Sequence, residues 1–235
     1  MDIETRQAKH IAMIMDGNRR YAKKLHLPAG VGHEKGAEKL SNVIKWCLEA
    51  EIKELTLYAF SMQNFHRKQE EVEGLFKLFR KHFAKLNDDK SIIEKKIRIK
   101  VVGRKHLFPN DIQESIAKIE EKTKQHDNLT INFAMAYGGR EEIVDAARKI
   151  ASEIKHNEIT AEEIDNETFA NHLYFKSDPD LVIRTGGDYR TSNFLPWQTV
   201  YSEWFFTQSL WPELNKEEFL DILNQFNNRE RRFGK

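Results

Sequence analysis

The chain has 235 residues, of which 40% are hydrophobic and 32% are charged, and its formal net charge is +1. This length is enough for one α/β domain with a sizeable core, and the composition excludes an intrinsically disordered chain. A net charge near zero excludes a bulk basic field that would favour nucleic acid or anionic lipid, so any affinity for anions must come from local clusters.

The first ten residues hold no apolar signal core, and no apolar run approaches the roughly 20 residues of a membrane span. We therefore expect a soluble, cytoplasmic protein. The single cysteine, Cys47, excludes a disulfide within the chain, which suits a reducing compartment. Cys47 shares an apolar helical face in residues 36–50, so we expect a buried, inert thiol.

Short β-rich runs alternate with amphipathic helical stretches along the chain. The expected strands are residues 11–15, 55–60, 97–103, 129–137, 181–185 and 203–208. This alternation predicts an α/β fold, a single domain over residues 1–235 with a largely parallel central sheet and helices on both faces. Several strands end in polar or Gly-rich turns. Ligands collect at the carboxyl ends of parallel strands, so we expect these turns to share one crevice.

The first expected strand leads into MDGNRRYAKK, residues 15–24. A strand-to-helix turn directs backbone N–H groups outwards, and the basic residues that follow make the segment typical of a phosphate site. Asp16 lies inside it, and a carboxylate beside a phosphate is explained by a divalent cation between them. Asp16 is therefore a candidate metal ligand; the alternative is that it only caps the turn or the helix. His33 would add a donor nearby, although a lone histidine is more often structural.

The segment FSMQNFHRKQEE, residues 60–71, follows the second expected strand. Ser61 and Asn64 could orient a substrate phosphate or a reacting carbon in the shared crevice. Arg67 and Glu71 are four residues apart, so their alternative role is a simple ion pair at the start of a helix.

The next stretch, residues 69–86, has a wide apolar face with three phenylalanines. Periodicity allows two interpretations: a core helix packed on the sheet, or the wall of a long apolar cavity. The apolar residues of this face are Val72, Leu75, Phe76, Leu78, Phe79, Phe83 and Leu86.

The segment LVIRTGGDYRTSNF, residues 181–194, begins as a buried strand and ends among anion-binding groups. An arginine guanidinium can donate two parallel hydrogen bonds to phosphate oxygens. A diphosphate would therefore suit the Gly-Gly turn, which is flanked by Arg184 and Arg190 and followed by Ser192. The alternative is a surface turn with solvated arginines. The pattern is neither a Walker loop nor a Rossmann fingerprint. Two diphosphate-like sites, one acidic, and an apolar cavity would suit a phosphorylated lipid precursor that meets a second diphosphate.

Taken together, these segments resemble the cis-prenyltransferase family, the undecaprenyl and dehydrodolichyl diphosphate synthases and their archaeal relatives, from His10 to Gly234. The matching motifs are HIAMIMDGNRRYAKK, GHEKG, LTLYAFSMQNFHR, AYGGR, DPDLVIRTGGDYRTSNFLPWQTVYSEWFF, LWPE and NRERRFG. The form DGNRR is closer to the archaeal and eukaryotic branch than to the usual bacterial form. Such enzymes add isopentenyl diphosphate units to an allylic diphosphate and create cis double bonds. The resemblance implies that a tunnel, with residues 69–86 as part of its wall, holds the growing chain.

The resemblance also assigns residues. It implies that Asp16 is catalytic and binds Mg²⁺, that Glu203 is a second metal-associated carboxylate, and that Asn64 is catalytic by positioning the proton lost after condensation, since an amide is a poor base. It implies substrate binding by Gly17, Asn18, Arg19, Arg20, Tyr21, His33, Ser61, Met62, Gln63, Phe65, Arg67, Arg184, Arg190, Thr191, Ser192, Arg232 and Gly234. Among these, the DGN segment and His33 would hold the allylic diphosphate, and Arg184, Arg190 and Ser192 the isopentenyl diphosphate.

Arg232 and Gly234 match an element that reaches the neighbouring subunit's site in family dimers, so the resemblance implies a homodimer, with transient membrane contact for product release. The sequence departs from the family pattern at Ala29, where bacterial members carry an arginine. This difference leaves the allylic starter undefined. Two other classes of protein are alternatives. A non-catalytic prenyl-diphosphate-binding scaffold is opposed by the complete motif set. A single-stranded RNA-binding protein is opposed by the near-zero net charge and the embedded carboxylates, so we expect no nucleic-acid partner.

Overall fold

The computed structural model describes residues 7–229, and its centre is a six-stranded sheet in the order β3-β4-β2-β1-β5-β6. Every pair of neighbouring strands is parallel. The strands are β1 His10–Ile14, β2 Glu54–Ser61, β3 Ile97–Val102, β4 Leu129–Tyr137, β5 Leu181–Arg184 and β6 Glu203–Phe206. All six expected strands are therefore present within two residues at either end, and the prediction of a largely parallel sheet is confirmed.

The helices connect these strands in the alternation that the sequence predicts. The α-helices are α1 Asn18–Lys24, α2 Ala29–Glu49, α3 Gln69–Asp88, α4 Lys90–Glu94, α5 Asn110–Thr123, α6 Gly139–Lys155, α7 Asn166–His172 and α8 Lys216–Asn227. Short 3₁₀ turns are η1 Met62–His66, η2 Lys105–Leu107, η3 Ala161–Glu163 and η4 Trp211–Glu213. In the described part of the chain, no helix combines the length and the apolar character needed to cross a membrane.

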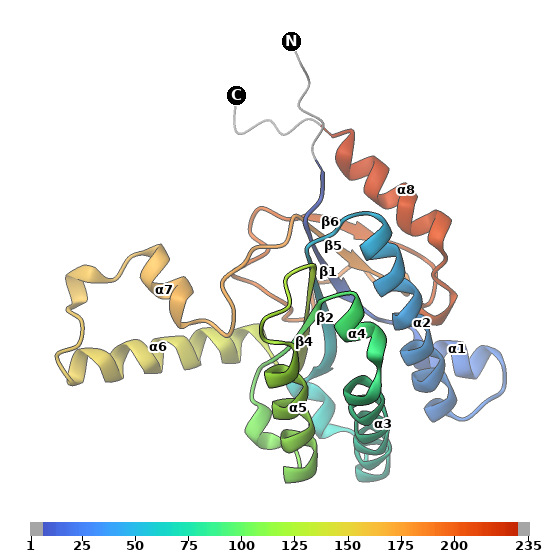
Figure 1. Ribbon diagram of the computed structural model, residues 1–235, viewed down its shortest axis with the longest axis horizontal. Coiled ribbons are helices and arrows are strands. Elements are labelled where there is room, and N and C mark those ends of the chain that lie inside the picture. Colours follow the sequence, from blue (N-terminus) through green and yellow to red (C-terminus); the bar gives the residue numbers. More distant parts are fainter. Residues whose placement is uncertain (1–6, 230–235) are drawn as a thin grey trace.

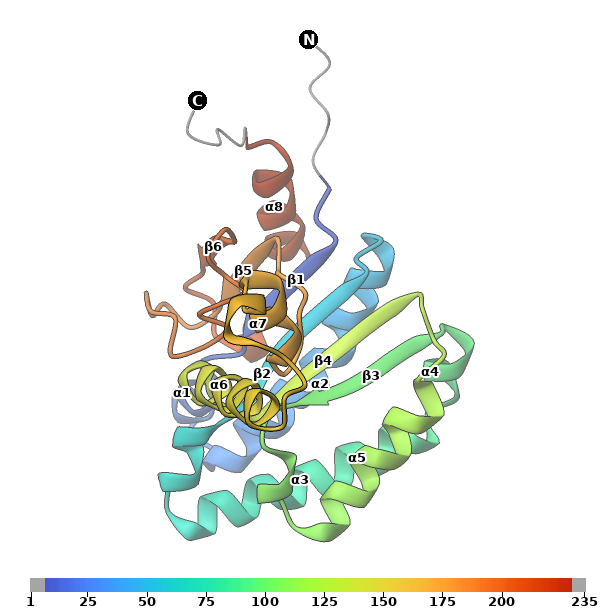
Figure 2. The ribbon, with the colours of Figure 1, turned by 90° about the vertical axis from the view of Figure 1, so that its left-hand side faces the viewer.

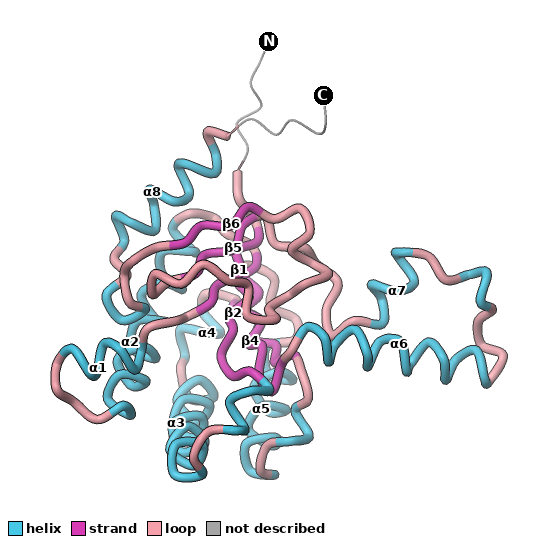
Figure 3. Tube along the Cα trace, turned by 180° about the vertical axis from the view of Figure 1, so that it is seen from behind, coloured by secondary structure: helices cyan, strands magenta, loops and turns pink. Residues whose placement is uncertain are grey.

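The two faces of the sheet are covered differently. Ile11 and Met13 point to the larger core, which includes buried residues of α2, α3, α5 and α8, whereas Ala12 and Ile14 point to a smaller one. The smaller core is completed by Phe194 and other residues of an irregular stretch, where the sequence analysis expected helices on both faces. α6 and α7 instead extend to one side of the sheet (Figures 1 and 3).

The larger core contains most of the amphipathic helices, and α3 and α5 lie side by side below the sheet (Figure 2). Cys47 is 0% exposed within this core, and burial raises the pKa of its thiol. The expectation of an inert cysteine is thus supported. The carboxyl ends of β1, β2, β4 and β5 meet at one edge, which is where the polar turns of the sequence are collected.

Candidate active site

The turn after β1 brings Asp16 to the carboxyl edge of the sheet. Parallel pairing sets Ile14 beside Arg184 of β5, so the chains that leave these two strands run side by side. The backbone oxygen of Asp16 accepts hydrogen bonds from the Trp211 N–H at 2.9 Å and the Thr185 hydroxyl at 2.7 Å. Gly17 follows with a φ of 113°, a conformation that favours glycine and that starts α1.

Two arginines hold the Asp16 carboxylate. Arg184 donates from Nη2 to Oδ2 at 2.8 Å, and Arg20 approaches Oδ1 at 3.2 Å. The Arg184 side chain is only 3% exposed, so this pair is partly desolvated. Burial alone raises the pKa of Asp16, but the hydrogen bond from Arg184 and the charge of Arg20 outweigh it, and the pKa is lowered overall. Asp16 is therefore ionised at neutral pH.

Arg184 also connects Asp16 to the second cluster that the sequence predicts. Its Nη1 donates to the Ser192 hydroxyl at 2.7 Å and to the backbone oxygen of Arg190 at 2.5 Å. Asp188 closes the network, because it lies 3.1 Å from Arg20 and 3.0 Å from Arg190. The cluster at Asp16 and the cluster at Arg190 and Ser192 therefore form one continuous charged network around the guanidinium of Arg184.

His33 lies on the other side of α1, where α2 begins. Burial and the charge of Arg67 lower the pKa of His33, so the imidazole is neutral at pH 7. Its Nε2 and the side-chain oxygen of Asn18 are both buried, and neither has a hydrogen-bond partner in residues 7–229. Arg19 lies 3.9 Å from Glu71, which also pairs with Arg67. Buried polar atoms without partners are costly, so their presence beside these cations indicates a place for a polar ligand.

The η1 turn holds the residues that follow β2. The Asn64 side-chain oxygen accepts a hydrogen bond from the Ser61 backbone N–H at 3.0 Å, as part of a capping box. Met62 and Phe65 pack against the larger core, whereas Gln63 is exposed. Asn64 therefore orients its own turn through its oxygen, and its amide nitrogen is the group that could serve a substrate.

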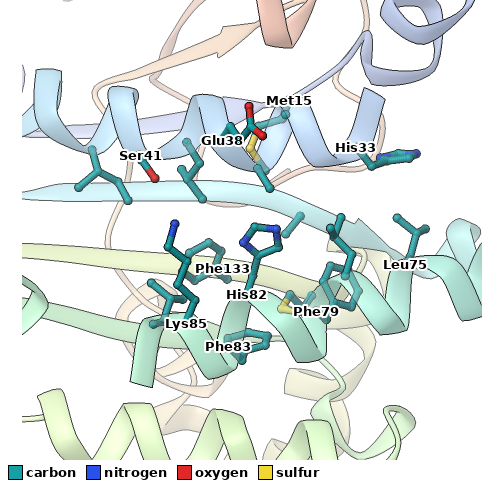
Figure 4. A pocket seen from close by; sticks show the side chains of 18 of the residues that line it. Met15, His33, Glu38, Ser41, Leu75, Phe79, His82, Phe83, Lys85 and Phe133 are labelled. Carbon is teal, nitrogen blue, oxygen red and sulfur yellow. The ribbon is translucent and has the colours of Figure 1, made fainter. Parts of the chain in front are cut away.

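An apolar cavity of about 220 Å³ leads away from His33 and Asn18, between α2, α3 and the sheet. Figure 4 shows Leu75, Phe79 and Phe83 of α3 on one wall, with Phe133 of β4 nearby. Ala59 at the end of β2 lines the same cavity. Of the two interpretations of residues 69–86, the structure supports both in part: Val72 and Phe76 belong to the core, and most of the other apolar residues of the face line the cavity.

Comparisons with known proteins agree with this arrangement. The family model of undecaprenyl diphosphate synthases matches residues 14–234. The chain belongs to this family. A tritrans,polycis-undecaprenyl-diphosphate synthase of Pyrococcus horikoshii, described as geranylgeranyl-diphosphate specific, is 47% identical over 229 residues, which are 97% of this chain and 87% of the relative.

Two solved structures extend the likeness to the fold. Lavandulyl diphosphate synthase from Lavandula x intermedia, in complex with dimethylallyl diphosphate, has a TM-score of 0.92 at 34% identity and covers 97% of this chain and 99% of its own. A Campylobacter jejuni protein described as a probable undecaprenyl diphosphate synthase has a TM-score of 0.82 at 33% identity, and the match covers 98% of this chain and 100% of that protein. The resemblance that the motifs suggested is thereby confirmed, and the homologues are prenyl diphosphate synthases.

Within this family fold, Glu203 does not lie beside Asp16. It begins β6 and pairs in register with Leu181, the first residue of β5, so it lies at the opposite edge of the sheet from Asp16. Its carboxylate accepts a hydrogen bond from Arg229 at 3.0 Å. Among residues 7–229, no cluster of three or more His, Cys, Asp or Glu side chains could hold a metal ion. One chain therefore does not pair Glu203 with Asp16, and the role of Glu203 as a metal ligand stays a prediction.

Asp16 on its own fits a Mg²⁺ ion, because this metal is typically bound by one or two carboxylates together with substrate phosphates. Tyr21 is a half-buried residue of α1, and Thr191 is an exposed residue next to Ser192. Arg232 and Gly234 lie outside the described residues. Their assignments, like those of the other substrate-binding residues, stay predictions.

The sequence analysis missed two residues of the site. Asp188 joins Arg20 to Arg190, and its position directly after Gly-Gly was an available signal. Asn193 supports the turn that carries Ser192, but its partners lie more than fifty residues away along the chain, so no local pattern identified it.

Proposed function

We propose that this protein is a Mg²⁺-dependent polyprenyl diphosphate synthase that adds isopentenyl diphosphate units to a geranylgeranyl diphosphate starter and forms cis double bonds. One observation carries the proposal: Arg184 bridges Asp16, at the allylic side, and Ser192, at the isopentenyl side, with bonds of 2.8 and 2.7 Å. Two diphosphates bound on either side of one guanidinium would bring their carbon chains together at the mouth of the apolar cavity.

The residues around Asp16 suit the departure of the allylic diphosphate. Bond cleavage places negative charge on the leaving group, and Arg19, Arg20 and the α1 N-terminus are donors that can stabilise this charge. Asp16 would hold Mg²⁺ here, and the bound ion would supply further neutralisation of that charge. The neutral His33 can donate one hydrogen bond to an oxygen without adding a fixed charge.

The isopentenyl side uses different groups. Arg184, Arg190 and Ser192 hold the second diphosphate, because two arginine forks and a hydroxyl match its oxygens. Asn64 orients the reacting carbons and the proton that is lost after condensation. The proton acceptor is a diphosphate oxygen or a water molecule, since the amide of Asn64 is a poor base.

The choice of starter is supported by the geranylgeranyl-diphosphate specificity described for the Pyrococcus horikoshii relative and by the leucines and phenylalanines of the cavity wall. We take the product to be a long-chain, mixed Z,E polyprenyl diphosphate that is the precursor of a lipid carrier for glycan synthesis. A homodimer is supported by exposed apolar residues around the edge strand β6: Tyr189, Val200 and Tyr201 are 71%, 67% and 77% exposed. A cytoplasmic enzyme with brief membrane contact would release such a product.

Incubation of the purified protein with labelled isopentenyl diphosphate, Mg²⁺ and each of geranyl, farnesyl and geranylgeranyl diphosphate tests the proposal. We expect elongation, with geranylgeranyl diphosphate as the preferred starter and long products on chromatography. The absence of labelled prenyl product with all three starters would contradict the proposed activity, and equal use of all three would contradict the starter preference. Sedimentation of the same sample tests the homodimer.

A further inference from the structure

Helix α6 lacks a cap from its own sequence. Its N-cap residue is Gly138, which has no side chain to bind the N–H groups that the first turn of a helix leaves unpaired. Asn193, from the turn after β5, supplies the cap. Its backbone oxygen accepts a hydrogen bond from the Gly139 N–H at 2.8 Å, and its Oδ1 accepts one from the Arg140 N–H at 2.9 Å. Its Nδ2 donates to Glu141 at 3.0 Å.

The glycines of α6 let the turn lie directly on the helix end. A Cβ atom on Gly139 would stand 1.9 Å from the Pro196 ring, and one on Gly138 would stand 2.9 Å from the Asn193 amide nitrogen. Both distances are shorter than real Cβ atoms show. Gly139 is therefore required by this contact, because the Pro196 ring cannot rotate away, whereas the Asn193 amide beside Gly138 belongs to a side chain that can move. The contact joins two segments far apart in the sequence.

A second contact holds the same turn from the sheet. The rings of Tyr58 and Phe194 stack with centroids 4.6 Å apart and an angle of 11° between planes, and Phe194 is 0% exposed. The Tyr58 hydroxyl also lies 3.4 Å from the backbone oxygen of Ser192. The turn is thus fixed on both sides, by β2 and by α6.

The backbone of the turn needs such support. Ser192, Asn193 and Leu195 have φ values of 51°, 62° and 51°, in the left-handed region that residues other than glycine rarely adopt. Conformations of this kind persist only where the surroundings impose them, and they occur at functional sites. Ser192 directly precedes Asn193, and its hydroxyl accepts the hydrogen bond from Arg184. The bonds at Asn193 therefore determine where the Ser192 hydroxyl lies.

We propose that Asn193 is a positioning residue of the isopentenyl diphosphate site: by capping α6 from a distance, it holds Ser192 and Arg190 in place to bind the diphosphate. This inference rests on the proposed function. It separates the two substrates, because the groups that bind the allylic diphosphate lie on α1 and α2 and are linked to this turn through Arg184 and through the ion pairs of Asp188 with Arg20 and Arg190, and neither link runs through Asn193. The support of Asn193 is thus specific to the isopentenyl side.

The test is Asn193→Ala, assayed in the dimeric full-length enzyme with each substrate varied in turn. We expect the KM for isopentenyl diphosphate to rise about tenfold, as for the loss of one or two hydrogen bonds, and the KM for geranylgeranyl diphosphate to change less than about twofold. Asp165→Ala is the matched control, because it removes the cap of α7, where Asp165 accepts from the Thr168 N–H at 2.7 Å, without a path to the site. It should lower stability and leave both KM values unchanged.

A paired variant keeps the test informative if Asn193→Ala folds poorly. Asn193→Asp places two carboxylates together and should raise the KM for isopentenyl diphosphate. The double variant Asn193→Asp with Glu141→Gln restores a donor and an acceptor in exchanged positions, so its KM for isopentenyl diphosphate should return most of the way to the wild-type value. The inference would be overturned if Asn193→Ala raised the KM values of both substrates equally, or if it lost thermal stability with both KM values unchanged. If the wild-type enzyme makes no product at all, the proposed function fails instead.

Discussion

Gly32→Ala should inactivate the enzyme because α1 and α2 touch at this glycine. A Cβ atom on Gly32 would lie 2.0 Å from the backbone oxygen of Asn18 and 3.1 Å from the side chain of Ala22. The clash is with backbone, so no side-chain rotation relieves it. Restoring an ordinary contact of 3.4 Å requires α1 to move by about 1.4 Å relative to α2. Asp16 and Gly17 lead directly into α1, so the diphosphate site moves too.

A displacement of about 1 Å in a catalytic site can cost about 100-fold in rate, and we expect kcat/KM to fall by that factor. Overpacking of this kind costs about 1–3 kcal/mol of stability, so a fall in Tm of several degrees should accompany it. Gly30→Ala is the matched control: it lies in the same helix, and a Cβ atom there would meet nothing within 4 Å. Steady-state kinetics and thermal unfolding of both variants give the answer. Wild-type kcat/KM in Gly32→Ala would refute the argument.

Four further predictions concern Asp16, Asn64, Asp145 and the last four residues. Asp16→Asn, or EDTA treatment of the wild type, should lower kcat at least about 100-fold, with Mg²⁺ restoring only the wild type; product formation measures both. Asn64→Ala should lower kcat far more than substrate affinity, and a rise in KM alone would contradict its positioning role. Asp145→Asn should cost about 1 kcal/mol at pH 7. The hydrogen bond from Arg104 lowers the pKa of Asp145 to about 2, below the value near 3.9 in an unfolded chain. The difference in free energy of unfolding between wild type and variant should therefore be complete above pH 4 and disappear as the pH falls through 2. Urea unfolding at several pH values measures this difference. Removal of the last four residues should reduce activity without lowering Tm, and full activity would exclude their role.

The sequence predicted the sheet well because short β-rich apolar runs and the turn residues that bound them are local signals. It also placed Asp16 and Arg184 at the same edge, since Asp16 follows one parallel strand and Arg184 ends another. It could not show that Arg184 bonds Asp16 and Ser192 together, because that depends on register between strands more than 160 residues apart. The same limit explains Glu203. The expected strand at residues 203–208 already begins at Glu203, but only the parallel pairing of β6 with β5 shows that Glu203 lies at the edge of the sheet away from Asp16.

Coverage of the second sheet face was also beyond the sequence. An irregular stretch around Phe194 has no periodicity, so the analysis expected helices there, as in a doubly wound sheet. The apolar face of α3 was ambiguous for a related reason: a helix on a core and a helix on a cavity bury the same side chains. Only the three-dimensional arrangement separates Val72, in the core, from Leu78, at the cavity.

The charges at the site explain how the buried side chain of Arg184 is held in position. Arg184 is almost completely buried, and a buried cation without a counterion would be strongly unfavourable. Asp16 and Asp188 supply that counterion to Arg184, Arg20 and Arg190, which leaves this network one positive charge in excess. A diphosphate entering from either side can therefore replace a carboxylate as partner of an arginine that is already oriented. Donors oriented before the substrate arrives need no reorganisation when charge develops, and this is the condition under which electrostatic stabilisation of a departing diphosphate is strongest.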